Sequence, residues 1–150
     1  MESSRLPLNG TRLAKPDGEV LVWAPGQGLL VASLRGNGYF EFSRAIIERF
    51  DEQRIVHKSL ALFFDAGRLE RYESPLRTTL TEHFLTHRKA ISRLEVFARS
   101  RMVTMGVSVA SLALGGLVKA HANVEPFRRS LEAALADRGV MGFSSDVLEL

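Results

Sequence analysis

The chain has 150 residues, 45% of them hydrophobic, which is enough for one folded domain with a real core. With 20 Lys and Arg against 17 Asp and Glu the formal net charge is +3, and the basic runs are too short to indicate a nucleic-acid binder. The chain has no cysteine, which excludes disulfides, thiol catalysis and Cys-ligated zinc and fits a cytoplasmic location.

The first third of the chain predicts an antiparallel strand meander. Lys15-Pro16-Asp17-Gly18 favours a tight turn, because Pro presets one backbone dihedral and Gly accepts a positive one. This turn can join strands at Thr11–Ala14 and Val20–Ala24, and a further strand is expected at Leu29–Leu34. From Tyr39 the apolar residues recur at helical spacing, which predicts a first helix.

The stretch Ser59–Leu80 anchors the fold prediction. Leu60–Phe64 is a continuous apolar run of strand length, typical of a central strand buried on both faces of a sheet. It stops at Asp65, and the polar residues Ala66–Glu73 predict a connecting loop. Ser74-Pro75 then predicts the start of a helix, because Ser can cap a helix and Pro suits its first position.

The last third predicts a strand, a helix, an edge strand and a second helix. A strand is expected at Leu94–Ala98, and a helix that is apolar nearly all round at Arg101–Leu114. Leu117–Ala122 predicts a short edge strand, and a last amphipathic helix ends near Gly139. Strands that alternate with helices predict a mixed α/β sheet, largely parallel after the meander, with about four helices.

The predicted elements occupy residues 11–139, which we expect to form a single domain. Residues 1–10 are expected to be a flexible N-terminal tail and residues 140–150 a C-terminal tail. The longest uncharged stretch, Met102–Val118, is shorter than the roughly 20 apolar residues that a membrane span needs, so no membrane span is predicted.

The order of these elements resembles that of the STAS domains, the SpoIIAA-like fold of anti-sigma factor antagonists and of the cytosolic tails of sulfate transporters. Their signature is an apolar strand ending in Asp, seven residues, then Asp-Ser and a helix. Here Asp65 is followed by seven residues and then Glu73-Ser74, with Pro75-Leu76 where the family usually has a small hydroxyl residue and Gly. The ending also resembles the family, with a short strand, a turn and a helix that contains Glu132-Ala133-Ala134-Leu135.

The resemblance implies a non-enzymatic, regulatory protein-interaction module of bacterial type, with an anti-sigma factor or a kinase-like regulator as its partner. The candidate partner-binding residues are Asp65, Glu73, Ser74 and Arg77. Ser74 matches the position that the family phosphorylates, whereas the residue pattern alone predicts a helix cap. The alternative function is a small-molecule or lipid-binding domain of the same fold, because related sheets with apolar peripheral helices can open a pocket.

The helix predicted at Arg101–Leu114 lacks the charged face with which a peripheral helix normally meets water. Gly106 is small enough to let another helix come close. A helix buried in the core of the domain is the alternative interpretation, but the missing charged face favours self-association or a surface for a partner, and we expect a homodimer. The residues expected to form its contact are Met102, Met105, Val109 and Leu112.

Two histidines are the candidates for metal ligands in this sequence, which also lacks the common catalytic motifs. His83 and His87 lie four apart, a spacing that can place two metal ligands on one helix face. The adjacent carboxylate is Glu82 and no HExxH motif is present, so no metal site is predicted and His87 is expected at the edge of the core. The sequence has no nucleophile elbow, phosphate loop or dinucleotide fingerprint, which predicts neither an enzyme nor a cofactor.

Overall fold

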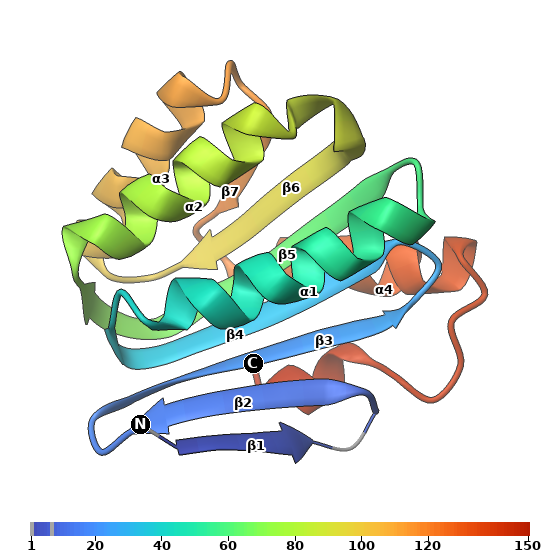
Figure 1. The fold of residues 1–150 in the computed structure, drawn as a ribbon, viewed down its shortest axis with the longest axis horizontal. Coiled ribbons are helices and arrows are strands. Elements are labelled where there is room, and N and C mark those ends of the chain that lie inside the picture. Colours follow the sequence, from blue (N-terminus) through green and yellow to red (C-terminus); the bar gives the residue numbers. More distant parts are fainter. Residues whose placement is uncertain (1, 7) are drawn as a thin grey trace.

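The structure is a computed structural model that describes residues 2–6 and 8–150. The strands of this described part form one seven-stranded sheet (Figure 1). Its strands are β1 (Glu2–Leu6), β2 (Gly10–Lys15), β3 (Gly18–Gly26), β4 (Leu29–Gly38), β5 (Leu60–Tyr72), β6 (Ile91–Ala98) and β7 (Val118–His121). Strands β1 to β4 pair antiparallel and β4 to β7 pair parallel. The predicted mixed α/β sheet with an N-terminal meander is confirmed.

Helices cover both faces of this sheet (Figure 1). The helical segments are α1 (Phe42–Val56), α2 (Ser74–Thr86), η1 (Arg88–Ala90), α3 (Arg101–Ala113), α4 (Val124–Asp137) and η2 (Ser145–Leu148). The parallel strands advance across the sheet in one direction, so crossovers of one hand place α1, α2 and α3 on the same face. Helix α4 follows the edge strand β7 and packs on the opposite face with η2.

Strand β5 is the centre of the core. Its side chains alternate between the two faces, with Leu60, Leu62 and Phe64 toward α1 to α3 and Ala61 and Phe63 toward α4. All five are at most 7% exposed. The predicted central strand, buried on both faces, is confirmed.

The same strand is longer than the sequence predicted. Ala66–Tyr72, expected as a loop, continues β5 and pairs with β4, where Arg35 lies opposite Arg68. The loop prediction is wrong because Leu69 is the one large aliphatic side chain of this segment: it is buried, whereas Arg68 and Glu70 on either side are exposed. Such alternation, over so few residues, is a weak signal for a strand.

The N-terminal residues belong to the sheet. Glu2–Leu6 pairs antiparallel with β2, so the prediction of a flexible tail over residues 1–10 is wrong for this strand. Met1 and Pro7, which the same prediction includes, lie outside the described residues. The sequence hides the strand because its five residues, ESSRL, carry one apolar residue.

The C-terminal segment also packs against the sheet rather than forming a tail. Phe143 and Leu148 are buried on the α4 face, and the Phe143 ring meets Trp23 edge to face at 5.8 Å. The Ser145 N–H donates to a Glu132 carboxylate oxygen at 2.6 Å, which ties the segment to α4. The tail prediction is wrong because these scattered apolar residues find their partners only in the folded structure.

Candidate functional site

The outer face of α3 carries a row of exposed apolar side chains. Ser100 begins the helix by accepting a hydrogen bond from the Val103 N–H at 3.1 Å. Val103 and Leu114 pack into the core, which turns the opposite face outward. The exposed large apolar side chains of that face are Met102 (55% exposed), Met105 (63%), Val109 (51%) and Leu112 (85%). In the described part of the chain, no helix combines the length and apolarity required to cross a membrane.

Gly106 lies on the inner side of α3, against β5. A Cβ atom placed on it would be 2.1 Å from the Tyr72 hydroxyl oxygen. The prediction that Gly106 makes room for a partner helix is therefore wrong, because Tyr72 of the same chain already occupies that space. The glycine instead lets α3 approach the end of β5.

An apolar cavity of about 110 Å³ lies beneath α2 and α3. Its walls include Phe64, Leu80, Phe84, Val107 and Ala110, and Arg77 stands among the lining residues as the charged member. A dry apolar cavity of about 150 Å³ is known to hold benzene, so a cavity of about 110 Å³ suits a small apolar molecule.

Three of the four predicted partner-binding residues lie together at the start of α2. Glu73 and Ser74 are exposed, and Arg77 is half-buried one turn later. The prediction that Ser74 caps the helix is wrong, because Glu73 occupies the N-cap position and Ser74 is the first helical residue. The Glu73 carboxylate accepts a hydrogen bond from the Phe40 N–H at 2.7 Å and so ties the start of α2 to the start of α1.

The fourth residue, Asp65, points to the opposite face of the sheet. It is 2% exposed and accepts hydrogen bonds from the Ser33 hydroxyl at 3.1 Å and the Gly67 N–H at 3.0 Å. Burial raises the pKa of the Asp65 carboxyl, and the hydrogen bonds from Gly67 and Ser33 only partly oppose this effect. Because a partner cannot reach a buried side chain, the prediction that Asp65 joins the α2 residues in one binding surface is wrong.

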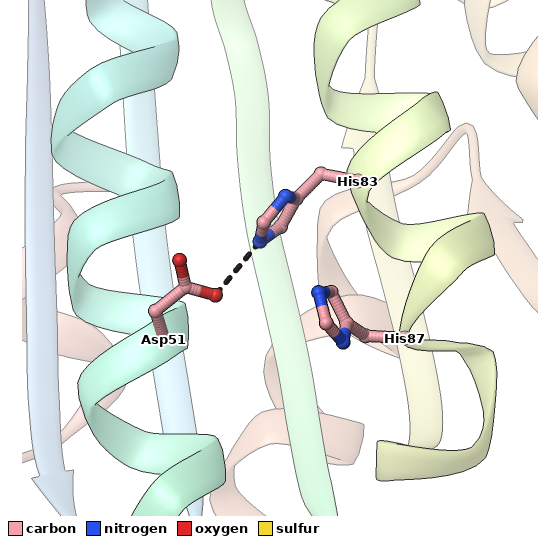
Figure 2. Close-up of side chains that lie close together, drawn as sticks. All are labelled: Asp51, His83 and His87. Atoms are coloured by element: carbon pink, nitrogen blue, oxygen red, sulfur yellow. Dashed lines mark hydrogen bonds and ion pairs between the residues drawn. The ribbon is translucent and has the colours of Figure 1, made fainter.

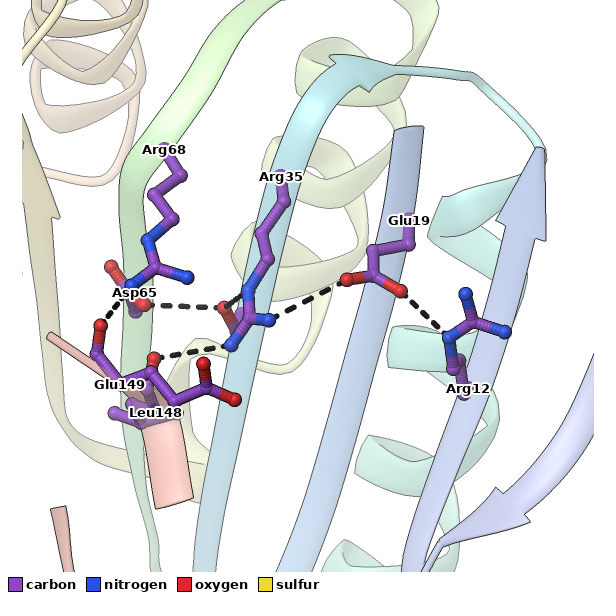
Figure 3. Close-up of polar contacts among 8 residues, drawn as sticks. Arg12, Glu19, Arg35, Asp65, Arg68, Leu148 and Glu149 are labelled. Carbon is purple, nitrogen blue, oxygen red and sulfur yellow. Dashed lines mark hydrogen bonds and ion pairs between the residues drawn. The ribbon is translucent and has the colours of Figure 1, made fainter. Parts of the chain in front are cut away.

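Polar contacts run from β2 across the α4 face to the end of the chain (Figure 3). A Glu19 carboxylate oxygen accepts from Arg12 Nε at 2.6 Å, and the other oxygen pairs with Arg35 at 3.5 Å. Arg35 also donates to the Leu148 carbonyl at 3.1 Å, and Arg68 donates to the next carbonyl along the chain. These contacts hold the η2 segment on the sheet.

A second buried carboxylate, Glu95 on β6, has a full set of partners. It accepts hydrogen bonds from Arg93 at 2.6 Å and Ser130 at 2.8 Å, and His121 Nε2 lies 2.7 Å from its other oxygen. Burial raises the Glu95 pKa, but the bonds to His121 and Ser130 and the charge of Arg93 lower it more, so it lies below its usual value. With both oxygens engaged, Glu95 has a structural role.

One polar cluster bridges α1 and α2 on the outer side of the molecule (Figure 2). His83 Nε2 lies 2.8 Å from Asp51 Oδ1, and the candidate ligand atoms of Asp51, His83 and His87 all lie within 4.8 Å of one another. All three residues are half-buried. Arg54 Nε donates to the same Asp51 oxygen at 2.8 Å.

The protonation of this cluster follows from its neighbours. Burial raises the pKa of Asp51, but hydrogen bonds from Arg54 and His83 lower it more, so this carboxyl is ionised at neutral pH. Loss of hydration lowers the pKa of His87, and the charges of Arg54 and His83 lower it further. The His87 ring is therefore neutral at neutral pH.

Comparison with known proteins identifies the fold. No family model and no curated protein matches the chain. Among solved structures it is similar to an uncharacterized protein from the DUF3478 family with a SpoIIAA-like fold from Shewanella loihica PV-4. The TM-score is 0.59 at 12% sequence identity, over 79% of this chain and 98% of that chain.

The chain has a SpoIIAA-like fold. This confirms the fold that the STAS resemblance implied. At 12% identity the likeness concerns the fold alone, so the site residues of this SpoIIAA-like chain rest on its own geometry.

Sequence reasoning about this SpoIIAA-like chain missed Asp51. Glu82, the carboxylate adjacent to His83 in the sequence, is exposed and does not join the cluster. Asp51 lies 32 residues away from His83 and reaches it only because α1 and α2 pack side by side. One feature of the sequence could have pointed to Asp51: it follows Phe50, which faces the core, so its side chain lies at the edge of the buried face of α1.

Proposed function

We propose that this chain is a non-enzymatic protein-interaction module whose contact surface is the outer face of α3. The single observation that carries the proposal is the exposure of four large apolar side chains on that helix, between 51% and 85% each. Exposed apolar side chains that form a continuous row mark an interaction site more often than scattered ones do. A second copy of the chain is the partner that this row fits best.

The spacing of the row supports a helix as the occupant. Met102, Met105, Val109 and Leu112 are separated by three, four and three residues, which is the alternation of a coiled-coil seam. Two such helices bury their seams against each other and remove eight apolar side chains from water. The row spans one helix of 13 residues, so the expected dimer is modest in area and in affinity.

Charge favours an antiparallel pair of α3 helices. Arg101 begins the helix, and no other charged residue follows before its end at Ala113. In an antiparallel pair the two Arg101 side chains lie far apart, each near the carboxyl end of the other helix. Cations are favoured there by the helix dipole.

We assign the start of α2 to a regulatory protein partner of the anti-sigma factor or kinase-like class, with Ser74 as the phosphorylation site. Ser74 and Glu73 are exposed, and Arg77 lies one turn along the same helix. A phosphate at the first helical residue meets the positive end of the helix dipole, so the helix tolerates it. Its effect would fall on the partner.

Binding of a small apolar molecule in the cavity beneath α2 and α3 is the second candidate function. The nearly complete apolar lining supports it, and the volume of about 110 Å³ favours a small ring compound over a lipid. Mass spectrometry of the purified protein under non-denaturing conditions separates the candidates. An apolar molecule that copurifies at one per chain would favour this function.

Light scattering over a range of protein concentrations tests the interaction module. We expect wild-type protein to dimerise, and Met105→Glu and Val109→Glu each to remain monomeric, because burying an unpaired charge in the contact is costly. Leu85→Glu is the matched control, since Leu85 is 51% exposed on α2 and lies outside the row. Wild-type protein that stays monomeric at the highest concentration would overturn the proposal.

A further inference from the structure

We propose that Asp51, His83 and His87 form a binding site for one divalent transition-metal ion, with Zn²⁺ as the test ion. The site bridges α1 and α2 and lies outside the exposed row of α3, so it is independent of the proposed interaction module. The proposal rests on donor chemistry, donor spacing and support of the donor side chains.

The donor set selects the class of metal. Two imidazole rings and one carboxylate are ligands that suit Zn²⁺, Cu²⁺ or Ni²⁺, whereas Mg²⁺ and Ca²⁺ prefer oxygen atoms alone. Three protein ligands leave one tetrahedral position for water, as in the open class of zinc sites. The lone pairs come from side chains that point toward one another across the gap between the two helices (Figure 2).

The spacing of the donor atoms requires only a small adjustment. Metal bonds of about 2.0–2.2 Å place the donors of a tetrahedral zinc site about 3.4 Å apart. His83 Nε2 and Asp51 Oδ1 are 2.8 Å apart in the hydrogen-bonded arrangement, and all three ligand atoms lie within 4.8 Å. The His83–Asp51 donor pair must therefore open by about 0.6 Å, and the wider donor pairs must close by at most about 1.4 Å. Both shifts are within the reach of side-chain rotation.

The two histidine rings are already held in place. His83 lies on the last turn of α2 and His87 is the residue that ends the helix, and their ring centroids are 4.8 Å apart. Phe50, fully buried on α1, supports both rings, with its centroid 5.6 Å from His83 and 6.1 Å from His87. A preorganised pair of this kind loses little side-chain freedom on binding an ion.

Arg54 opposes binding and makes the proposal more specific. Its Nε donates to Asp51 Oδ1 at 2.8 Å, so a metal ion at that oxygen must displace this bond and accept the nearby positive charge. Removing the charge should tighten metal binding. A purely structural ion cluster predicts no such gain, because Arg54 would then be one of its stabilising members.

Titration calorimetry with Zn²⁺ on tag-free protein tests the site. We expect one ion per chain for the wild type, at least tenfold weaker binding for His83→Ala and His87→Ala, and several-fold tighter binding for Arg54→Leu. His57→Ala is the matched control, because His57 is half-buried at the end of α1 and lies outside the cluster. It should bind as the wild type does.

Two further measurements guard against misfolded variants. Circular dichroism in the presence of a chelator checks that each variant is folded, and His83→Gln replaces His83→Ala if the latter is not. Co²⁺ added to the wild type should give the visible absorption bands of a tetrahedral nitrogen and oxygen site. Absent Zn²⁺ binding by the wild type, or equal binding by the wild type and both histidine variants, would overturn the proposal.

Discussion

The two faces of the sheet differ in the kind of side chain that they bury. The face under α4 contains the two buried carboxylates of the described residues, Asp65 and Glu95, and each has hydrogen-bond partners on its oxygens. The face under α1, α2 and α3 is built mainly from apolar side chains, with Ser43 and Arg49 of α1 among its buried polar residues, and it contains the cavity beneath α2 and α3. Hydrogen bonds to the buried carboxylates hold the α4 face in one arrangement. The other face contains the cavity and the exposed helix α3.

The two faces therefore differ in how easily they can rearrange, and the candidate sites lie on the face that rearranges more easily. A charge network with every partner present resists rearrangement, because moving one member leaves another buried without a partner. Apolar contacts around a cavity are non-directional and can be remade at lower cost. The outer row of α3, the start of α2 and the Asp51 cluster all belong to the more adaptable side.

The largest expected effect compares neighbouring phenylalanines that face opposite sides of β5. Phe63→Ala should lower the free energy of unfolding by about 4 kcal/mol, because its ring is fully buried against Phe127. Phe64→Ala should cost less, about 3 kcal/mol, because Phe64 lines the cavity and already lacks neighbours on one side. Urea denaturation of both variants measures the difference. Equal losses would mean that the two faces are equally packed.

The second comparison sets the two buried carboxylates against each other. Glu95→Ala should cost about 3 kcal/mol at neutral pH, because it leaves His121 and Ser130 without their acceptor. Asp65→Asn should change stability by less than about 1 kcal/mol, since it keeps the side-chain shape and removes a buried charge. Chemical denaturation at neutral pH measures both losses of stability, and an equal cost for Asp65→Asn would mean that the fold depends on the Asp65 carboxylate as strongly as on Glu95.

The two carboxyl groups contribute to the pH dependence of stability with opposite signs, and each variant lacks the contribution of the group that it removes. The folded-state pKa of Glu95 is lowered, so its contribution is present above its ordinary value of 4.5 and is lost as the pH falls through the folded-state value. The folded-state pKa of Asp65 is raised, so its ionisation costs stability as the pH rises from its ordinary value of 3.8 through the folded-state value. Denaturation curves for each variant between acidic and neutral pH measure both slopes.

The smallest expected effect is at Ser74, on the adaptable side. Ser74→Ala should change the free energy of unfolding by less than about 0.5 kcal/mol, because Glu73 holds the N-cap position. Ser74→Asp should be neutral or slightly stabilising, since a carboxylate in the first turn meets the helix dipole. Thermal unfolding of both variants, with Glu73→Ala as the control, tests this. A loss above about 1 kcal/mol for Ser74→Ala would restore the cap that the sequence predicted.

Elements with a strong local pattern were predictable from the sequence. The run Leu60–Phe64 and the helix at Arg101–Ala113 are where the apolar spacing placed them, because each pattern lies within one element. The extension of β5 and the strand at Glu2–Leu6 were not predictable. Their stability comes from pairing with β4 and β2 rather than from apolar content of their own.

The candidate sites also differ in whether they depend on one element or on the packing of several. The exposed row of α3 follows from one helix, and its residues lie on the surface as expected. The side of the sheet to which Asp65 points depends on where β5 begins, since a shift of one residue reverses every side chain. The pairing of Asp51 with His83 depends on two helices far apart in the sequence.

The order of the strands has a consequence for how the chain reaches its fold. Each strand from β1 to β7 lies beside the one that precedes it, so a chain emerging from the ribosome can add strands at one growing edge. The hydrogen bond from Arg35 to the Leu148 carbonyl is an exception, because it joins residues 113 positions apart. Loop-closure entropy delays such a contact until the intervening chain is compact. The η2 segment therefore docks on a sheet whose strands are already in place.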